Sequence, residues 1–370
     1  MISLRADDKI LERSIQRPLD LKAWQLKIPG VPCMKTAVLQ SDALNENGYL
    51  IPFYRAVNEL SALGIKKMAV SVAVVYPGKF GDNSPSVDFI DEKSEKKLCD
   101  NLKKIKKLCD TLSFVFKDAE LSITKTGNVK TVTVTAVEIA DEISDEIADG
   151  IEMADGSSKE SDSLSDNRRK DESGKVSVSD YELKRGLSKD LSYDIVMTKS
   201  AGMSGAILSA SEWILSGKHF PWKDEYVNKL FEYSNHLSVV KECQIAAKHG
   251  ARIMLPVSDG GVSGALWRLG IAIKCGIDID GKKICVSQDI IELCEFFDLS
   301  PYELMGDGSL IIATENGEEL KNKLLCEGIK AEVIGKTSTL ADKTMTFFGN
   351  KRYITKSRGD EMRIVDIYNV

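Results

Sequence analysis

Two glycines and two polar residues separate a strand-like apolar run from a helix-like one in the second half of the chain. The stretch is "ARIMLPVSDGGVSGALWRLGIAI" (residues 251–273), with "SDGG" at residues 258–261. Glycines allow the positive φ angles of a tight connector. Backbone N–H groups at the start of a helix also bind anions such as phosphate. The stretch alone leaves both interpretations open, a structural connector and an anion site.

Other glycine-bearing turns occur in the same half of the chain. The strand-like "YDIVMTK" (residues 193–199) is followed by "SAGMSG" and then by the helix-like "AILSASEWIL". Further on, the strand-like "SLIIAT" and "AEVIGK" flank an amphipathic, helix-like segment. These patterns predict strands and helices that alternate along the chain, which is α+β organisation.

The elements expected in the first half also mix strands and helices. Apolar spacing and turn residues predict a strand at 35–44, a helix at 54–65, a strand at 66–78, a helix at 92–112, and two antiparallel strands at 113–127 and 129–140 joined near "KTGN". The lysine-rich face of the second helix is expected to be a solvated surface.

The composition changes at residues 141–175, which are acidic and serine-rich. Such a segment buries too little apolar surface to offset its ordering entropy, so we expect a disordered surface insertion. Isoleucines at every fourth position from Ile139 to Ile151 leave a short partner-docking helix as the alternative.

Composition narrows the class of protein. The chain has 370 residues, enough for two domains, and 43% hydrophobic residues. Its net charge of −6 argues against a nucleic-acid binder, because phosphate contacts need clustered Lys and Arg. We see no apolar run long enough to cross a membrane and no apolar signal-peptide core, so we expect a cytoplasmic protein that binds neither membrane nor nucleic acid.

Cysteine and histidine usage gives no sign of a zinc or disulfide framework. The eight cysteines form no C-x-x-C pair, and the three histidines show no paired metal-ligand spacing. We therefore expect reduced thiols in the core.

The order of these segments resembles the family of AIR synthase (phosphoribosyl-aminoimidazole synthetase) and the maturation protein HypE, and especially its AIR synthase-related branch. The resemblance is carried in the second half by "DIVMTKSAGMSGAILSA", "AAKHGARIMLPVSDGGVSGALWRL", "ELCEFFDLSPYELMGDGSLIIAT" and "GIKAEVIGK". In the first half it is carried by "LQSDAL", "RAVNELSALGIKKMAVSVAV" and "SFVFKDAELSIT". It covers most of the chain apart from the acidic insertion.

The resemblance implies a two-domain α/β fold of the PurM type. An N-terminal ATP-side domain is expected over residues 1–178, a C-terminal domain over 179–350, and a C-terminal strand or tail over 351–370. It also implies a homodimer formed through a β-barrel of the N-terminal domains, with ATP in the cleft between the domains. In active relatives the phosphoryl group of ATP goes to the oxygen of an amide-type carbonyl, which makes that oxygen a better leaving group.

The resemblance also implies a set of site residues. It places carboxylates for Mg²⁺ at Asp42, Glu59 and Asp118, and hard oxygen ligands of this kind suit that ion. It places nucleotide contacts at Lys117, Lys199, Gly202, Gly205, Ser258, Gly260, Gly261, Gly308 and Ser309. For each of these residues a purely structural role, as a turn or surface residue, is the alternative.

Several family signatures are changed. The glycine- and aspartate-containing segment before the first long strand is replaced by "KIPGVPCMKTAV" (residues 27–38), which has no acid. Glu59 replaces an aspartate in "NELSALG", and Leu255 and Pro256 stand where histidine and aspartate are usual. The chain ends "RIVDIYNV", without the cysteine that receives the carbamoyl group in HypE, so that reaction is not expected. Signatures for a purine substrate are not recognisable.

Two functions remain. The first is an AIR synthase-related enzyme that uses ATP and Mg²⁺ to activate a small amide- or carbonyl-type substrate by phosphoryl transfer. The second is a catalytically degenerate dimeric protein that binds nucleotide or acts as a scaffold, with the acidic insertion as a contact for a protein partner. The sequence identifies no catalytic residue.

Overall fold

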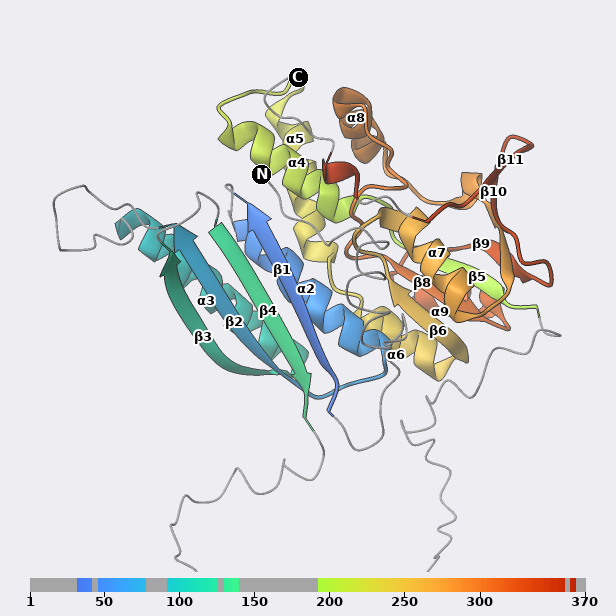
Figure 1. The fold of residues 1–370 in the computed structure, drawn as a ribbon, viewed down its shortest axis with the longest axis horizontal. Helices are drawn as coiled ribbons and strands as arrows, with labels where there is room; N and C mark the ends of the chain where they lie inside the picture. Colours follow the sequence, from blue (N-terminus) through green and yellow to red (C-terminus); the bar gives the residue numbers. More distant parts are fainter. Residues whose placement is uncertain are drawn as a thin grey trace, which may run out of the picture.

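A computed structural model describes residues 32–41, 46–77, 92–124, 130–139, 192–356 and 360–363. These residues form a mixed α/β structure with two sheets (Figure 1). The predicted α/β class is therefore confirmed. The acidic insertion at 141–175 and the expected domain boundary at residue 178 lie outside the described residues.

The first unit contains β1 (Met34–Ser41), α2 (Glu46–Ala62), β2 (Met68–Pro77), α3 (Glu92–Leu112), β3 (Val115–Thr124) and β4 (Lys130–Glu138). Its strands are ordered β1-β4-β2-β3, with β3 parallel to β2 and β4 antiparallel to both β2 and β1. The expected antiparallel orientation of the last two strands is confirmed. The two strands are not neighbours, because α3 makes a crossover that places β3 parallel to β2, and β2 lies between β3 and β4.

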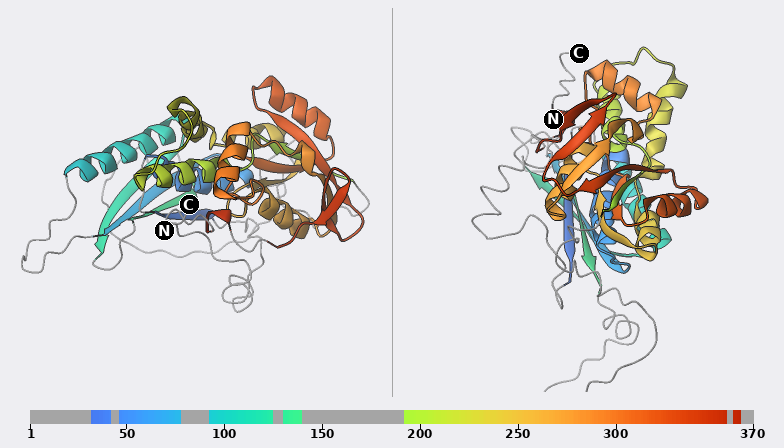
Figure 2. Two further views of the ribbon diagram at one scale, coloured as in Figure 1. Left: turned by 90° about the horizontal axis from the view of Figure 1, so that it is seen from above. Right: turned by 90° about the vertical axis from the view of Figure 1, so that its right-hand side faces the viewer.

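The two faces of this sheet differ in burial because side chains alternate along each strand. Val70, Val72 and Val74 of β2 are buried beneath α2 and α3, while Ser71 and Ala73 between them are partly exposed. Figures 1 and 2 show both helices on one side of the sheet. Among the described elements, none covers the other side, which we call the outer sheet face.

The second unit is a larger sheet with helices around it. Its elements are β5 (Asp194–Thr198), α4 (Met203–Leu215), α5 (Asp224–Glu232), α6 (Val240–Lys248), β6 (Ala251–Pro256), α7 (Gly261–Ala272), β7 (Gly276–Asp280), α8 (Gln288–Phe297), β8 (Leu310–Thr314), α9 (Gly317–Cys326), β9 (Ala331–Ser338), β10 (Lys343–Phe347) and β11 (Asn350–Tyr353). The strand order is β11-β10-β7-β9-β5-β8-β6. Both β5 and β6 run antiparallel to β8. The carboxyl ends of β5 and β6 therefore meet the start of β8 at one end of the sheet.

Helix α2 joins the two units. Most of its residues are buried, and it packs against β1 and β4 on one side and against α4, α6 and β6 on the other. The side-chain amide of Asn58 donates to the carbonyl of Leu237 at 2.8 Å and accepts from the N–H of Val239 at 2.9 Å. Phe53 of α2 and Met203 of α4 lie in the same buried cluster. The described helices include none long and apolar enough to span a membrane.

Candidate functional site

Three turns of the second unit meet at the end of the sheet where β5, β6 and β8 come together. The carbonyl of Ser258 accepts hydrogen bonds from the N–H of Gly261 at 3.0 Å and of Gly306 at 3.4 Å. The hydroxyl of Ser309, fully buried, donates to the carbonyl of Ser200 at 2.6 Å. The structure thus brings together three turns, the outer two of which are 109 residues apart in sequence.

Glycines are required at these turns by packing as well as by backbone conformation. Gly260, at the N-cap of α7, has φ 76°, and Gly261 has φ 60°. A Cβ on Gly261 would lie 2.5 Å from the carbonyl oxygen of Tyr302, and one on Gly205 would lie 2.4 Å from Leu304 Cγ. The loop that precedes β8 therefore packs directly against the backbone of the other two turns.

Three more of the predicted residues lie in the same region. Gly202 is the N-cap of α4 with φ 75°, and Gly308 has φ 104°; a Cβ on Gly308 would lie 2.7 Å from the carbonyl oxygen of His236. The ammonium of Lys199 pairs with Glu242 and donates to the carbonyls of His236 and Ser238. These internal contacts occupy the three N–H groups of Lys199.

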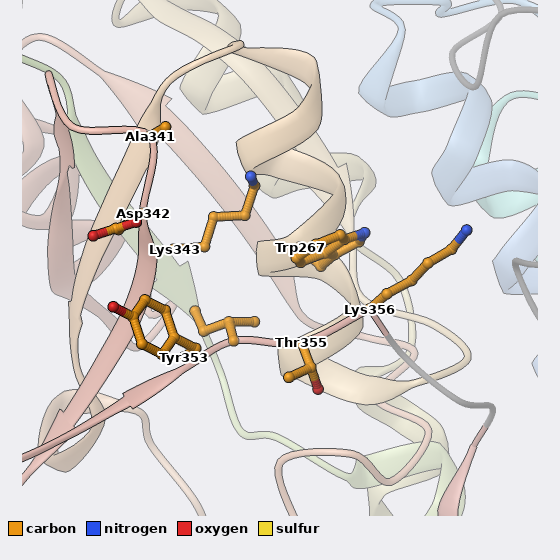
Figure 3. Close-up of a pocket in the computed structure, with 8 residues that line it drawn as sticks. Trp267, Ala341, Asp342, Lys343, Tyr353, Thr355 and Lys356 are labelled. Atoms are coloured by element: carbon orange, nitrogen blue, oxygen red, sulfur yellow. The ribbon is translucent and has the colours of Figure 1, made fainter.

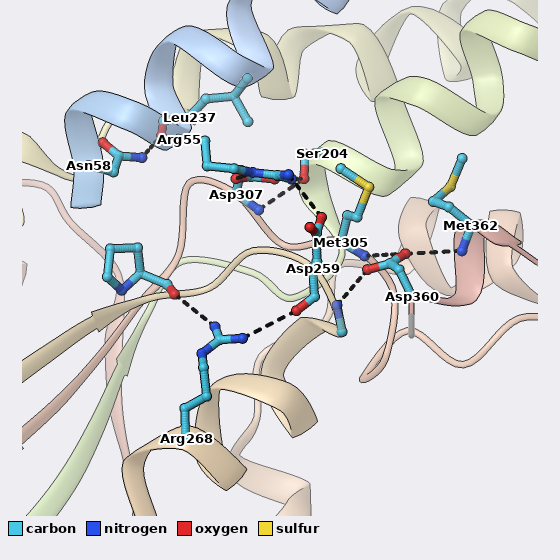
Figure 4. A network of polar contacts seen from close by, with 12 residues as sticks. Arg55, Asn58, Ser204, Leu237, Asp259, Arg268, Met305, Asp307, Asp360 and Met362 are labelled. Carbon is cyan, nitrogen blue, oxygen red and sulfur yellow. Dashed lines mark hydrogen bonds and ion pairs between the residues drawn. The ribbon is translucent and has the colours of Figure 1, made fainter. Parts of the chain in front are cut away.

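A buried ion cluster lies beside the turns, where α2 meets them (Figure 4). Arg55 of α2 donates to both carboxylate oxygens of Asp307, from Nε at 2.8 Å and Nη2 at 2.7 Å. Its Nη1 lies 2.9 Å from Asp259, the acid of "SDGG". The side chains of Arg55, Asp259 and Asp307 are only 13%, 12% and 2% exposed. The cluster therefore fixes the first unit against the glycine turns with charges that are largely shielded from water.

Hydrogen bonds with Ser204 fix the position of Asp307. The Ser204 hydroxyl donates to Asp307 Oδ2 at 2.7 Å, and the same hydroxyl accepts from the Asp307 N–H at 2.9 Å. Burial lowers the pKa of Arg55, but Asp259 and Asp307 raise it by more, so its pKa lies above the ordinary value. Arg55 is therefore a permanent cation at this site.

A third carboxylate occupies the N-terminus of α7. Asp360 Oδ2 accepts from the N–H of Gly260 at 2.7 Å, and Oδ1 accepts from the N–H groups of Met305 at 3.2 Å and Met362 at 3.0 Å. Asp360 is 3% exposed. Burial and the nearby Asp259 raise the pKa of Asp360 to about 7, against the lowering effect of the three N–H groups. The "SDGG" turn thus binds an anionic group, and that group belongs to the chain itself.

Arg55, Asp307 and Asp360 are not among the site residues that the resemblance implies. Asp307 lies in the glycine turn "GDGS", whose glycine and serine were identified, so the signal for that turn was present. Arg55 lies in an expected helix, and Asp360 in "KSRGDEMR" near the end of the chain. Neither local pattern indicates a partner, because these contacts span 252 and 100 residues of sequence.

The predicted metal-binding carboxylates are not brought together. Asp42 lies outside the described residues. Glu59 lies on α2 with its carboxylate 4.0 Å from Lys35 of β1, whereas Asp118 is exposed on β3, at the opposite edge of the sheet. With strands about 4.8 Å apart, three spacings separate these edges by about 14 Å. Across the described ranges, no group of three His, Cys, Asp or Glu residues could hold a metal ion.

Lys117 precedes Asp118 on the exposed strand β3. The β2–β3 pairing passes from Val70–Phe116 to Ser71–Asp118, so Lys117 is the additional residue of a bulge. Its side chain is exposed, far from the glycine turns. Within the described structure, the remaining nucleotide-site residues gather in the second unit without Lys117.

A separate surface pocket of about 430 Å³ lies on the second unit (Figure 3). It is lined by Trp267, Ala341, Asp342, Lys343, Tyr353, Ile354, Thr355 and Lys356. The ammonium of Lys343 lies 4.9 Å from the centre of the Trp267 ring. None of the predicted site residues lines this pocket.

A comparison with known families supports the resemblance for most of the second unit. Residues 194–345 match the model of the AIR synthase related protein, C-terminal domain. The second unit is therefore similar to the C-terminal domain of AIR synthase-related proteins. The matched region contains all the glycine turns described above, together with Asp259 and Asp307. A comparison with curated protein sequences gave no match.

Solved structures show a likeness in fold over most of the chain. The chain is similar to a structure from a HypE–HypF complex, with TM-score 0.64 and 13% identity, covering 94% of this chain and 99% of that one. HypE in complex with ATP gives TM-score 0.54 at 13% identity and covers 94% and 93%. AaThiL complexed with AMPPCP and TMP gives 0.58 at 13% identity and covers 96% and 99%. At these identities the likeness establishes the fold alone.

Proposed function

We propose that this protein is an ATP-dependent enzyme that activates a small amide- or carbonyl-type substrate by phosphoryl transfer. The observation that supports this most is the carboxylate bound at the N-terminus of α7 by the N–H of Gly260. It indicates that the turn provides a site for an anionic oxygen, as helix N-termini do for phosphate. The two AIR synthase-type neighbours solved with ATP and AMPPCP agree with this proposal.

The residues of the second unit fit a phosphate group in one respect. Asp360 stands in for an anion at Gly260, whereas the space beside Gly205 and Gly261 is filled by the loop before β8. Arg55 lies next to this position through Asp259. When bound, ATP would supply the transferable phosphoryl group, while Gly260 would orient an oxygen and Arg55 would hold Asp259 in place.

The described residues do not support a magnesium site on the predicted carboxylates. Of the described candidates, Glu59 on α2 faces Lys35 of the edge strand β1, whereas Asp118 lies on β3, the opposite edge of the first sheet. They therefore cannot share one ion in this arrangement, and no step is assigned to Mg²⁺ on these residues. Asp42, in the undescribed stretch after β1, stays a predicted ligand.

The second candidate function is a degenerate nucleotide-binding or scaffold protein of the same fold. Two observations favour it: the separation of Glu59 from Asp118, and the occupation of the "SDGG" turn by Asp360. A protein that no longer transfers phosphoryl groups has no need for either metal ligands or an open turn.

We also propose that the protein is a cytoplasmic homodimer formed through the outer sheet face. On β1, β4 and β2 this face carries no charged side chain, only the residues Met34, Thr36, Val38, Gln40, Thr131, Thr133, Thr135, Val137, Ala69, Ser71, Ala73 and Val75. Met34 and Val38 are 59% and 46% exposed. On β3 the same face carries Asp118 and Glu120, beside Ser71 and Ala73. The uncharged part on the other three strands suits packing against a second sheet.

Thermal unfolding with and without nucleotide tests ATP binding. A ligand at about 100 times its dissociation constant stabilises the folded protein by about 2.7 kcal/mol. We expect Mg-ATP and AMPPCP to raise the melting temperature, with Mg²⁺ alone as the control. An unchanged melting temperature with both nucleotides would contradict the enzyme and favour the scaffold. If a nucleotide does bind, release of ADP in the presence of candidate amide substrates distinguishes transfer from binding.

A further inference from the structure

Each residue of the described part of the chain's last segment, Asp360–Met362, contacts the second unit, and the N–H of Glu361 also donates to the carbonyl of Glu303 at 3.5 Å. Asp360 accepts three N–H bonds, from Gly260, Met305 and Met362. The carboxylate of Glu361 accepts from the N–H of Ser300 at 3.2 Å. We call residues 360–362 the strap, because they bind across the loop before β8 and the start of α7.

The contact made by Met362 is mainly apolar. Met362 is 4% exposed and lies in the buried cluster shared by α2 and α4, where the Ser209 hydroxyl donates to its sulfur at 3.0 Å. The strap is therefore anchored beside the "SDGG" turn and not merely placed there by a single hydrogen bond.

The strap adds negative charge to a site that already has an excess of it. Arg55 faces Asp259 and Asp307, and Asp360 is the third acid of this network (Figure 4). The other cation drawn there, Arg268, donates to the backbone carbonyls of Asp259 and Pro256 and pairs with none of the three carboxylates. The repulsion from Asp259 and the burial of Asp360 both raise the pKa of Asp360. Docking of the strap is thus opposed by local electrostatics and supported by its N–H bonds and by Met362.

We propose that the strap is an autoinhibitory element whose Asp360 carboxylate occupies the anion position of the "SDGG" turn. This inference rests on the proposed function in one respect, namely that the turn binds an anionic group of a ligand. The single N–H of Gly260 cannot donate a full hydrogen bond to a ligand oxygen and to the Asp360 carboxylate at the same time. Ligand binding and strap docking therefore exclude each other. The apparent affinity for the anion is then the intrinsic affinity multiplied by the fraction of molecules whose strap is released.

Titration calorimetry on the full-length protein tests this, with inorganic phosphate and Mg-ATP as probes. We expect Asp360→Ala to bind at least one probe tenfold or more tightly than the unchanged protein, because charge-assisted hydrogen bonds that hold the strap are lost. Glu361→Gln is the matched control. It changes the neighbouring carboxylate, which contacts Ser300 and not the turn, and should shift affinity much less.

Hydrogen exchange on the unchanged protein gives a second test that needs no variant. Saturating probe should speed exchange at the Met362 N–H, which Asp360 holds, while the N–H of Gly260 stays protected because the probe replaces Asp360. If Asp360→Ala does not fold, hydrogen exchange on the unchanged protein still shows whether the probe displaces the strap.

The outcomes separate the inference from the proposed function. Equal affinity of both proteins, with no change in Met362 exchange, would leave ATP binding intact and overturn the strap. Binding only by Asp360→Ala would support the strap strongly. If neither protein binds phosphate or Mg-ATP, both the strap and the ATP-dependent function are wrong, and Asp360 is a structural cap of α7.

Discussion

Replacing Arg55 with methionine should be among the most destabilising single changes in the boundary between the two units. The change keeps an apolar stem in α2 but removes the cation that contacts Asp307 through two hydrogen bonds and Asp259 through an ion pair. The side chains of Asp259 and Asp307 are largely buried, at 12% and 2% exposure respectively. Removing one partner of a buried ion pair costs about 3–5 kcal/mol, because the other charge stays in a poorly solvated position.

The matched control is Arg252→Met. Arg252 also contacts one carboxylate through Nε and Nη2, at 3.1 and 2.6 Å from Glu315, but these side chains are 56% and 41% exposed. Exposed pairs contribute about 0–1 kcal/mol.

Urea unfolding of the unchanged protein and both variants, read from midpoints and slopes, gives the free energies of unfolding. We expect Arg55→Met to lose about 3 kcal/mol or more and Arg252→Met less than about 1 kcal/mol. Adding Asp307→Asn to Arg55→Met should recover part of the loss, since the amide is neutral. Equal, small losses in both single variants would refute the view that the ion cluster holds the units together.

Three further predictions concern single positions. The pKa of Asp360 is raised to about 7, so the contribution of this group to the free energy of unfolding is full below about pH 4 and declines as the pH rises through 7. The decline is at most about 4 kcal/mol. In urea unfolding at pH 4 to 8, Asp360→Asn should flatten it. Gly261→Ala should lower the free energy of unfolding by about 1–3 kcal/mol more than Gly217→Ala. Both glycines have positive φ, but only Gly261 also faces backbone oxygen atoms within 3 Å of an added Cβ. Similar melting curves for the two variants would contradict this. Val38→Lys should convert the proposed homodimer to a monomer in sedimentation analysis, whereas Leu121→Lys, exposed on the edge strand, should not.

Local patterns in the sequence predicted the glycine turns because each turn is encoded by adjacent residues. The strand "ARIMLP" and the helix after "SDGG" lie where apolar spacing placed them, at β6 and α7. Helix α2 begins earlier than its pattern indicated, at Glu46, and continues through Pro52. Burial on nearly all sides stabilises this helix despite the proline, and burial of that kind is a property of the fold and not of the local sequence.

Contacts between distant residues could not be predicted. The pairing of β3 with β2 depends on the crossover through α3, so two strands adjacent in sequence are separated in the sheet. Arg55 and Asp360 look like ordinary surface residues in their local context, and only the packing of α2 and the strap on the second unit buries them. The resemblance suggested a set of metal ligands from aligned motifs, and such motifs carry no information on which sheet edge each residue occupies.

Because α2 contributes to the cores of both units, neither unit is a self-sufficient module. A fragment that begins after residue 191 would expose Leu237 and Val239 where Asn58 now binds, and would leave Asp307 without its guanidinium partner. Cutting the gene between the two sheets is therefore expected to yield insoluble halves, while co-expression of both halves offers a route to a split, complementing pair.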